Sequence, residues 1–208
     1  LKKSFLKQIK KYLKNNELEK ANTFKKAFLA IEKLEANQDL IKEDSLFLEH
    51  EKRKILLQLK EVLALRTLPH LIETIDISHL AGKEKVGIIV SFLDGIYQPH
   101  LLKKFKIKTV LKPDDPKMIY EVLLRRLRHK EWGLPDLFLI DGGKIQFKFA
   151  KKAMEVNNLN IDIIALAKPK EEIYYNENKK LLLKNYPLIR NFILSLDKKA
   201  HQLVLKYH

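Results

Sequence analysis

The sequence predicts an α/β protein, in which a mixed β-sheet is flanked by helices and preceded by a helical N-terminal segment. Two observations predict this fold. Residues 1–68 contain neither glycine nor proline, which is typical of a run of helices. Beyond residue 69, strand-like runs come first and then alternate with helical patterns, an order that favours a mixed sheet covered by helices. We therefore expect a helical segment over 1–68 and a core domain over 69–208.

The helical segment ends in a strongly periodic stretch. Its apolar residues recur at intervals of three and four, as in Ile55, Leu56, Leu59, Val62 and Leu63. This spacing places them on one face of a helix. Pro69 then closes the segment, because proline restricts the residue before it to extended conformations. The pattern predicts two or three helices before the boundary.

Three strands are predicted directly after the boundary. The run from Ile72 to Ser78 is short, alternating and rich in β-branched residues, and a second strand follows from Val86 to Leu93. Asp94-Gly95 signals a tight turn into a third strand between Tyr97 and Ile107. Connections this short favour an antiparallel meander.

The next part of the chain alternates helices with buried strands. Pro113-Asp114-Asp115-Pro116 supplies a helix N-cap and a proline in the first turn, and this helix should run to about His129. The apolar run Leu137–Ile140 ends at Gly142-Gly143 and predicts a central strand buried on both faces. A helix over 145–156 should then lead to another buried strand over 161–166.

The C-terminal part is predicted to hold two short strands and a final helix. The strands are expected from Glu172 to Tyr175 and from Leu181 to Lys184, and Pro187 opens the helix. Its apolar stripe consists of Ile189, Phe192, Ile193, Leu196, Ala200, Leu203 and Tyr207.

The composition points to a polyanionic partner. The chain has 41 Lys and Arg against 26 Asp and Glu, a formal charge of +15. Nucleic acid is the leading candidate, and lysine-rich residue usage is the alternative. No apolar run approaches the roughly 20 residues of a membrane span, so we expect no membrane partner. The absence of cysteine excludes disulfides and a cysteine nucleophile, and it fits the cytoplasmic location that we expect.

Two aspartates stand where catalytic carboxylates are found. Asp76 lies within an apolar strand, where an ionised carboxylate is costly unless it is paired, hydrogen-bonded or bound to a cation. Asp141 ends the buried strand 137–140, and the carboxyl ends of such strands are where open sheets bind ligands. The alternatives are that Asp76 accepts backbone N–H bonds and that Asp141 caps the following helix.

A second acidic position lies at a helix start. Asp114 and Asp115 precede Pro116, and capping explains at least one of them. The pair can also bring an acidic ligand to a site holding Asp76 and Asp141, since hard divalent cations prefer several oxygen ligands.

A histidine near the end of the last helix completes the candidate set. His201 lies at the edge of the apolar stripe, one turn beyond Asp197. Two interpretations are open for His201. It is a structural residue, or, if its imidazole faces the carboxylates, it is a metal ligand or a general acid/base. Aspartates on the first strand, at a helix start and at the end of a central strand, with this histidine, are the layout of ribonuclease H-like nucleases. In such a site divalent cations activate water and stabilise charge on the phosphate.

A series of short motifs resembles the C-terminal half of UvrC, a DNA repair protein. They are Ile75-Asp76-Ile77-Ser78-His79, Lys112-Pro113-Asp114-Asp115, Leu139-Ile140-Asp141-Gly142-Gly143-Lys144 with Gln146, Leu166-Ala167-Lys168, and Ala200-His201 with Tyr207-His208. The resemblance covers residues 68–208, and the first 68 residues resemble the family only loosely. It implies a ribonuclease H-like mixed sheet flanked by helices.

The resemblance also implies a function. Members of the family make the incision on the 5′ side of a lesion during nucleotide excision repair. The expected cofactor is Mg²⁺ or Mn²⁺, and the substrate is damaged double-stranded DNA. UvrA is expected to load UvrB, and UvrB then recruits the enzyme to the lesion. By motif, the catalytic residues are Asp76, Asp115, Asp141 and His201, with Asp76, Asp141 and His201 as metal ligands. Asp114 is the less favoured member of its pair.

Four further residues are implied to face the DNA phosphates. Lys144 and Gln146 lie beside the active strand, and Lys103 and Lys104 lie on the third strand. The alternative is that all four are solvated surface residues.

The sequence departs from the family's pattern near several of these positions. Asp197-Lys198-Lys199 stands where the family has Arg-Asp-Glu, and Gln202 stands where an arginine is usual. Leu102-Lys103-Lys104 replaces an aromatic residue followed by two arginines, and Pro116 replaces a common tyrosine. The altered surroundings of His201 motivate an alternative function, a catalytically silent DNA- or protein-binding module that keeps the fold.

Overall fold

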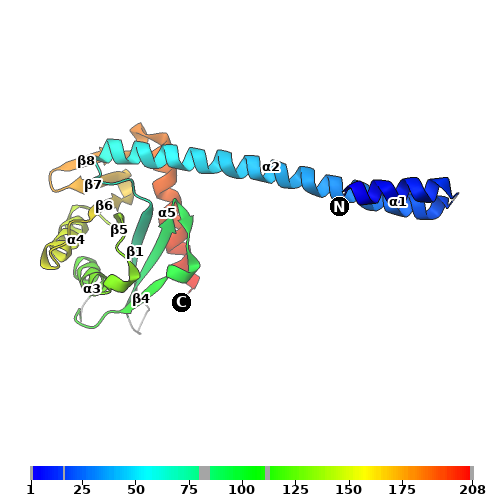
Figure 1. Ribbon diagram of the computed structural model, residues 1–208. Coiled ribbons are helices and arrows are strands. Elements are labelled where there is room, and N and C mark those ends of the chain that lie inside the picture. The colour runs from blue at the N-terminus through cyan, green and yellow to red at the C-terminus, as the bar shows by residue number, and fades with distance from the viewer. Residues whose placement is uncertain (1, 16, 80–84, 111–112, 207–208) are drawn as a thin grey trace. The chain divides into compact units, whose positions relative to one another are not determined.

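The computed structural model describes residues 2–15, 17–79, 85–110 and 113–206, and the chain divides into two compact units (Figure 1). Unit 1 is Leu1–Glu51 and unit 2 is Lys52–His208. Unit 2 therefore begins ahead of Pro69, where the sequence suggested a boundary. The difference arises because Leu56, Leu59 and Leu63 are buried in the core of unit 2.

Unit 1 is helical. It contains α1 (Lys2–Lys14) and the first part of α2 (Leu18–Leu63). The ring centroids of Phe5 and Tyr12 lie 5.7 and 5.3 Å from that of Phe24, so the two helices pack through aromatic side chains. Two helices before the sheet agree with the sequence prediction.

Unit 2 is built on a mixed sheet of eight described strands, in the order β3-β2-β1-β5-β6-β7-β8, with β4 also paired to β2. The strands are β1 (Leu71–His79), β2 (Lys85–Leu93), β3 (Ile96–Tyr97), β4 (Lys103–Lys106), β5 (Leu137–Asp141), β6 (Asp162–Ala167), β7 (Glu172–Asn176) and β8 (Lys179–Leu182). β5 pairs in parallel with β1 on one side and β6 on the other, and the remaining pairs are antiparallel. The predicted central strand and the mixed sheet are confirmed.

The prediction of one continuous third strand is wrong. The chain forms two short strands, β3 and β4, separated by the 3-10 turn η1 (Pro99–Leu101). Proline has no backbone N–H to donate to the neighbouring strand, so pairing with β2 stops at Pro99. Both pieces pair antiparallel with β2, which confirms the predicted meander.

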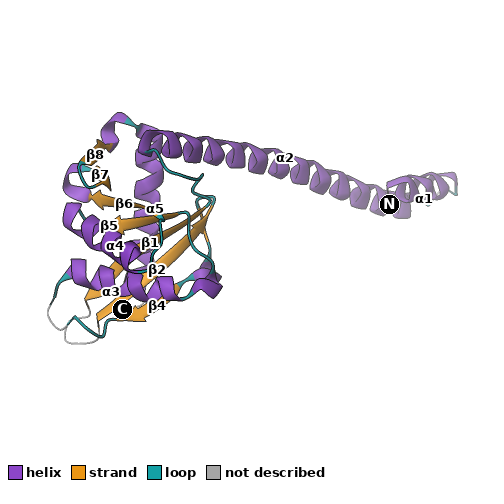
Figure 2. Cartoon of the chain, turned by 60° about the vertical axis from the view of Figure 1, so that its left-hand side comes forward, coloured by secondary structure: helices purple, strands orange, loops and turns teal. Residues whose placement is uncertain are grey.

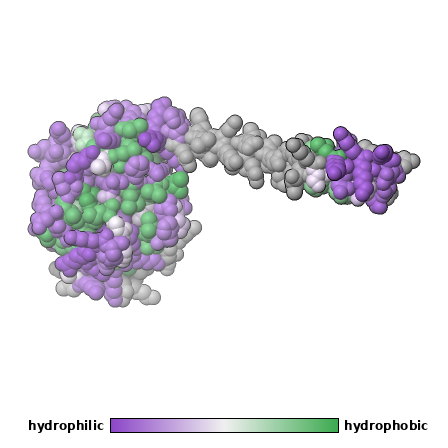
Figure 3. All heavy atoms as spheres, viewed as in Figure 1, coloured by the Kyte–Doolittle hydropathy of each residue, from purple (hydrophilic) through white to green (hydrophobic). Residues whose placement is uncertain are grey.

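Helices cover both faces of the sheet (Figures 1 and 2). α3 (Asp115–Arg128) and α4 (Lys144–Val156) lie on one face, and α5 (Pro187–Lys206) lies on the other with the end of α2. The visible surface of unit 2 is mainly hydrophilic (Figure 3). Among the described residues, no helix combines the length and apolar character needed to cross a bilayer.

The sheet separates two hydrophobic core layers. Under α3 and α4, Phe138 and Ile140 of β5 pack with residues such as Leu123 of α3. On the opposite face, the predicted stripe of α5 is buried at Ile189, Phe192, Ile193, Leu196 and Ala200 and partly buried at Leu203. Tyr207, the last member of that stripe, lies outside the described residues, as do Lys112 and His208 of the sequence motifs. Because successive side chains of a strand point to opposite faces of the sheet, alternate residues of one strand pack into different core layers.

Candidate active site

Three parallel strands end at the same edge of the sheet and bring distant residues together. β1 and β5 pair with Ile75 opposite Ile140, so Asp76 and Asp141 follow next to one another. β6 lies on the other side of β5, and Lys168 begins the 3-10 turn η3 (Lys168–Lys170) directly after it. The carboxyl end of the central strand, where the sequence placed Asp141, is thus occupied by charged side chains.

α5 contributes two more groups to this edge. Asp197 and His201 are four residues apart, which places them on the same helix face. The imidazole Nδ1 of His201 lies 3.3 Å from Oδ2 of Asp76, within hydrogen-bonding distance. His201 therefore faces the carboxylates, which was the condition for giving it a chemical role.

Lys168 connects the carboxylates of two elements. Its Nζ lies 2.8 Å from Oδ2 of Asp141 and 3.3 Å from Oδ2 of Asp197. Sequence reasoning assigned no role to Lys168 or Asp197. The signals that could have found them are the position of Lys168 after a buried strand and the four-residue spacing between Asp197 and His201. We call Asp76, Asp141, Asp197, His201 and Lys168 the acidic cluster.

Burial opposes the charged forms of two carboxylates of the cluster, Asp76 and Asp197. Burial raises the pKa of Asp76, whose side chain is 13% exposed; His201 counteracts this shift and the nearby charge of Asp141 adds to it. Burial also raises the pKa of Asp197, against the opposing effect of Lys168. Burial works against the charged form of Lys168, yet Asp141 and Asp197 outweigh it and raise the pKa of the ammonium. Burial thus opposes the charged forms of Asp76 and Asp197, and their neighbours offset only part of that effect.

The donor atoms of the cluster are of the kind that hard divalent cations accept, carboxylate oxygens and an imidazole nitrogen. Within the part of the chain that the structure describes, no group of three or more acidic or histidine side chains is arranged so that it could hold a metal ion. The ammonium of Lys168 forms ion pairs with both Asp141 and Asp197 and supplies a positive charge there. The residue types therefore fit a cation, and Lys168 pairs with two of the carboxylates.

The turn after Asp141 is shaped by glycine and capped by Gln146. Gly142 has φ of +143°, and a Cβ at this position would lie 2.5 Å from Cγ of Gln146. The backbone N–H of Gly143 donates to Oε1 of Gln146 at 3.0 Å. Gln146 rather than Asp141 therefore caps α4, which leaves Asp141 to the cluster. Lys144, in the first turn of α4, is exposed.

In the acidic pair at the start of α3, Asp114 has the capping role. Asp114 is the N-cap, and its Oδ1 accepts from the backbone N–H of Lys117 at 3.2 Å. Asp115 is the first residue of α3 and is exposed. A catalytic role for Asp115 stays a prediction.

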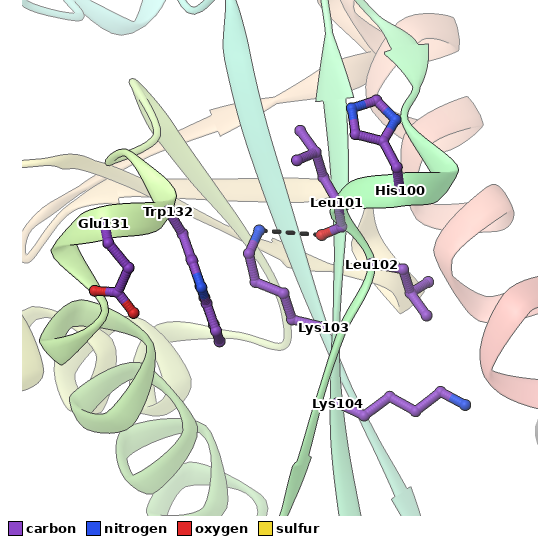
Figure 4. Close-up of a pocket in the computed structure, with 7 residues that line it drawn as sticks. All are labelled: His100, Leu101, Leu102, Lys103, Lys104, Glu131 and Trp132. Atoms are coloured by element: carbon purple, nitrogen blue, oxygen red, sulfur yellow. Dashed lines mark hydrogen bonds between the residues drawn. The ribbon is translucent and has the colours of Figure 1, made fainter.

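The two lysines of β4 differ in their surroundings. Nζ of Lys103 lies 2.8 Å from Oε1 of the buried Glu73, and only 10% of its side chain is exposed. The structure therefore does not support the predicted contact of Lys103 with phosphate, because the ammonium of Lys103 pairs with a buried carboxylate. Lys104 is exposed and extends away from Lys103 (Figure 4).

Comparison with known proteins gives a consistent result. The family described as UvrC RNAse H endonuclease domain matches residues 60–205. The chain is 39% identical over 154 residues to UvrABC system protein C of Methanococcus maripaludis, covering 72% of this chain and 29% of that protein. It is 32% identical over 191 residues to the same protein of Caldicellulosiruptor saccharolyticus, covering 88% and 32%. The chain thus spans about three tenths of the length of these relatives.

Among solved structures, the chain is similar to Ciona intestinalis endonuclease V in complex with DNA that contains an inosine. The overlap covers 59% of this chain and 56% of that one, with 14% identity and a TM-score of 0.37. A likeness this low adds nothing to the assignment.

Proposed function

Because the chain belongs to the UvrC RNase H endonuclease domain family, we propose that it is a divalent-metal-dependent endonuclease that makes the 5′ incision at lesions in nucleotide excision repair. The observation that carries this proposal is the convergence of Asp76, Asp141, Asp197 and His201 at the end of the central strands. Side chains from β1, β5 and α5 meet there although they are far apart in the sequence.

The cluster suits Mg²⁺ or Mn²⁺ in charge and in donor chemistry. Asp76, Asp141 and His201 would hold the ion, as the sequence suggested, and Asp197 adds a further carboxylate. Two of these carboxylates have raised pKa values, so an added positive charge relieves the cost of their burial. When bound, such ions activate water and neutralise charge on a phosphate during in-line displacement.

The residues of the chain prepare the site for this chemistry. Lys168 supplies the counter-charge for Asp141 and Asp197 in the cation-free protein. The contact with Asp76 orients the imidazole of His201, and a histidine in this position can serve as a general acid or base. No covalent nucleophile is required.

The formal charge of +15 supports DNA as the partner. The curated relatives are named as components of the UvrABC system, which supports UvrB as the protein that recruits the chain to damage and UvrA as acting before it. This function implies a cytoplasmic protein. Lys104, Lys144 and Gln146 remain proposed contacts to the phosphates.

The proposal is tested by nicking of a damaged duplex that already carries the 3′ incision, with Mn²⁺ present. Wild-type protein should nick the strand, and Asp141→Asn should reduce the rate by roughly 100-fold or more, since loss of even an outer ligand partner costs 10–100-fold. Asp94→Asn is the matched control, because it removes a carboxylate that pairs with His70 outside the acidic cluster.

One result would decide for the catalytically silent binding module instead. This is the absence of Mn²⁺-dependent cleavage by the wild-type chain even when it is joined to the remaining domains of a full-length relative. DNA binding should persist in that case.

A further inference from the structure

A line of lysines runs along α4 from the acidic cluster. Lys144, Lys148 and Lys151 are spaced by four and three residues, which places them on the same side of the helix. Lys144 and Lys148 are exposed, and the side chain of Lys151 is 45% exposed. We call these three residues the α4 strip. Glu155, one turn beyond Lys151, ends the strip.

The α4 strip begins at the edge of the sheet that carries the acidic cluster. Lys144 is the first residue of α4 and follows Asp141 across two glycines. α4 connects the parallel strands β5 and β6, so it runs from this edge back toward the opposite one (Figures 1 and 2). Although α4 covers the face opposite α5, its first turn therefore lies at the edge where Asp141 meets Asp76.

The three cations act together on one carboxylate outside the helix. Nζ of Lys151 lies 3.0 Å from Oε1 of Glu177, in the turn between β7 and β8. The hydrogen bond with Lys151 lowers the pKa of Glu177, and the charges of Lys148 and Lys144 lower it further. Both side chains of the ion pair are about half exposed, at 45% and 48%. Such a pair contributes little to stability, so a phosphate can replace the carboxylate.

The strip is unfavourable for an isolated helix. Like charges three or four residues apart on a helix repel each other, and Glu155 is the only acidic residue of α4. A partner with regularly spaced negative charge relieves this repulsion. Lys144 and Lys151 lie about 10.5 Å apart along the helix axis, at a rise of about 1.5 Å per residue. One strand of a DNA duplex carries a phosphate about every 3.4 Å of its axis, so the strip matches about three phosphates.

We propose that the α4 strip binds the phosphate backbone of the DNA duplex next to the incision site, with Lys148 and Lys151 as contacts beyond Lys144. Contacts of this kind fix the position of a duplex without reading its sequence. Glu177 holds Lys151 in the DNA-free protein and releases it when DNA binds. This inference rests on the proposed function, because it takes DNA as the substrate of the acidic cluster.

The salt dependence of DNA binding tests the strip. Affinity for a labelled duplex is measured by fluorescence anisotropy in EDTA, so that no strand is cut. Lys148→Gln/Lys151→Gln should weaken binding roughly tenfold or more at ~0.1 M salt. The slope of log K against log salt should become shallower by about two, because each lost phosphate contact contributes about 0.9.

The matched control is Lys54→Gln/Lys130→Gln. It removes the same charge from exposed lysines of α2 and of the 3-10 turn η2 (Lys130–Trp132), and its slope should equal that of wild type. Glutamine preserves helix propensity, and thermal unfolding verifies that each variant is folded. With Mn²⁺ present, loss of the strip should raise KM by far more than it lowers kcat, because these contacts bind substrate and transition state alike.

Removing the internal partner of the strip should have the opposite effect. Glu177→Gln should strengthen DNA binding about twofold or more at low salt, and the gain should fade as salt screens the charges. Glu131→Gln is the control, because it removes an exposed carboxylate that pairs with His129 instead. An equal gain in both variants would show that net charge alone is responsible, and it would contradict a specific role of Lys151.

The outcomes separate this inference from the proposed function. Wild-type affinity and slope in Lys148→Gln/Lys151→Gln, or equal losses in the control, would overturn the strip and leave the nuclease proposal intact. Unchanged DNA binding would then leave an acidic protein segment as the partner of the strip. If wild-type protein binds no DNA, both proposals fail. Strip-dependent binding without Mn²⁺-dependent cleavage would support the strip alone.

Discussion

At the scale of single residues, Asp76 shows the cost of assembling the acidic cluster. Its folded-state pKa is raised above the ordinary value of 3.8, mainly by burial, so the folded protein favours the protonated form. Stability from this group is therefore present at pH below 3.8 and is lost as the pH rises through the raised pKa. At neutral pH the ionised carboxylate works against folding.

Replacing Asp76 by Asn should stabilise the cation-free protein and abolish cleavage. At pH 7 in EDTA we expect the Tm of Asp76→Asn to exceed that of wild type. The increase should be about 2–4 °C for each kcal/mol of destabilisation that the substitution removes. The difference should disappear in strongly acidic buffer, and Asp94→Asn should not reproduce it. Thermal unfolding across pH provides the measurement. A lower Tm of Asp76→Asn at every pH would contradict the electrostatic account.

Lys168 should act as a competitor of the divalent cation. Lys168→Met removes the counter-charge of Asp141 and Asp197, so the variant in EDTA should lose about 1 kcal/mol or less, because the pair is partly exposed. Mn²⁺ should then raise the Tm of Lys168→Met by more than it raises that of wild type. Lys170→Met, from the same turn, serves as the control. An equal Mn²⁺ effect in all three proteins would refute the competition.

The two halves of the acidic cluster were not equally predictable. Asp141 could be predicted because an apolar run and two glycines mark the end of a buried strand. Asp197 and Lys168 gave only weaker signals, because each looks like an ordinary surface charge until α5 packs on the sheet. Lys103 was placed among the phosphate contacts because nothing in the sequence near it reveals its contact with Glu73, which lies 30 positions away.

At the scale of elements, α3 is tied to the sheet by a buried ion pair. The guanidinium of Arg126 donates to both carboxylate oxygens of Glu73, at 2.8 and 2.9 Å, and both side chains are fully buried. Lys103 of β4 adds a second cation. The contact joins β1, α3 and β4.

Breaking this pair should be costly. Arg126→Met leaves Glu73 buried with one cation, and removal of one partner of such a pair typically costs about 3–5 kcal/mol. Urea unfolding should report that loss. Arg125→Met, next along α3 and 30% exposed, should change stability by about 1 kcal/mol or less. Comparable losses in the two variants would show that burial of the pair is not the cause.

The order of the elements followed from the sequence more readily than their continuity. Alternation of polar and apolar residues identified β1, and the apolar run identified β5 as central. The interruption at Pro99 was missed because the residues on both sides remain strand-like. Proline breaks pairing even where the side-chain pattern continues.

At the scale of the whole molecule, the sheet depends on residues that precede it. Leu56, Leu59 and Leu63 are 1%, 0% and 3% exposed, and they belong to the core layer under α5. Burial of three such side chains contributes about 5–9 kcal/mol, which is comparable with the total stability of a domain. Unit 2 therefore needs the last turns of α2.

Two shortened chains test this dependence. Residues 52–208 should unfold cooperatively, with a Tm close to that of unit 2 in the full chain. Residues 69–208, which begin at Pro69, should lose the cooperative transition or aggregate, because an apolar face of the sheet is uncovered. Differential scanning calorimetry distinguishes the two. Matching transitions would mean that the leucines of α2 contribute little.

The position of α5 after the last strand of the sheet has a consequence for synthesis on the ribosome. A nascent polypeptide that stops before Pro187 already contains Asp76 and Asp141, but it has neither Asp197 nor His201 and cannot cover one side of its sheet. The proposed cutting chemistry therefore becomes available only after α5 has been made and has packed on the sheet.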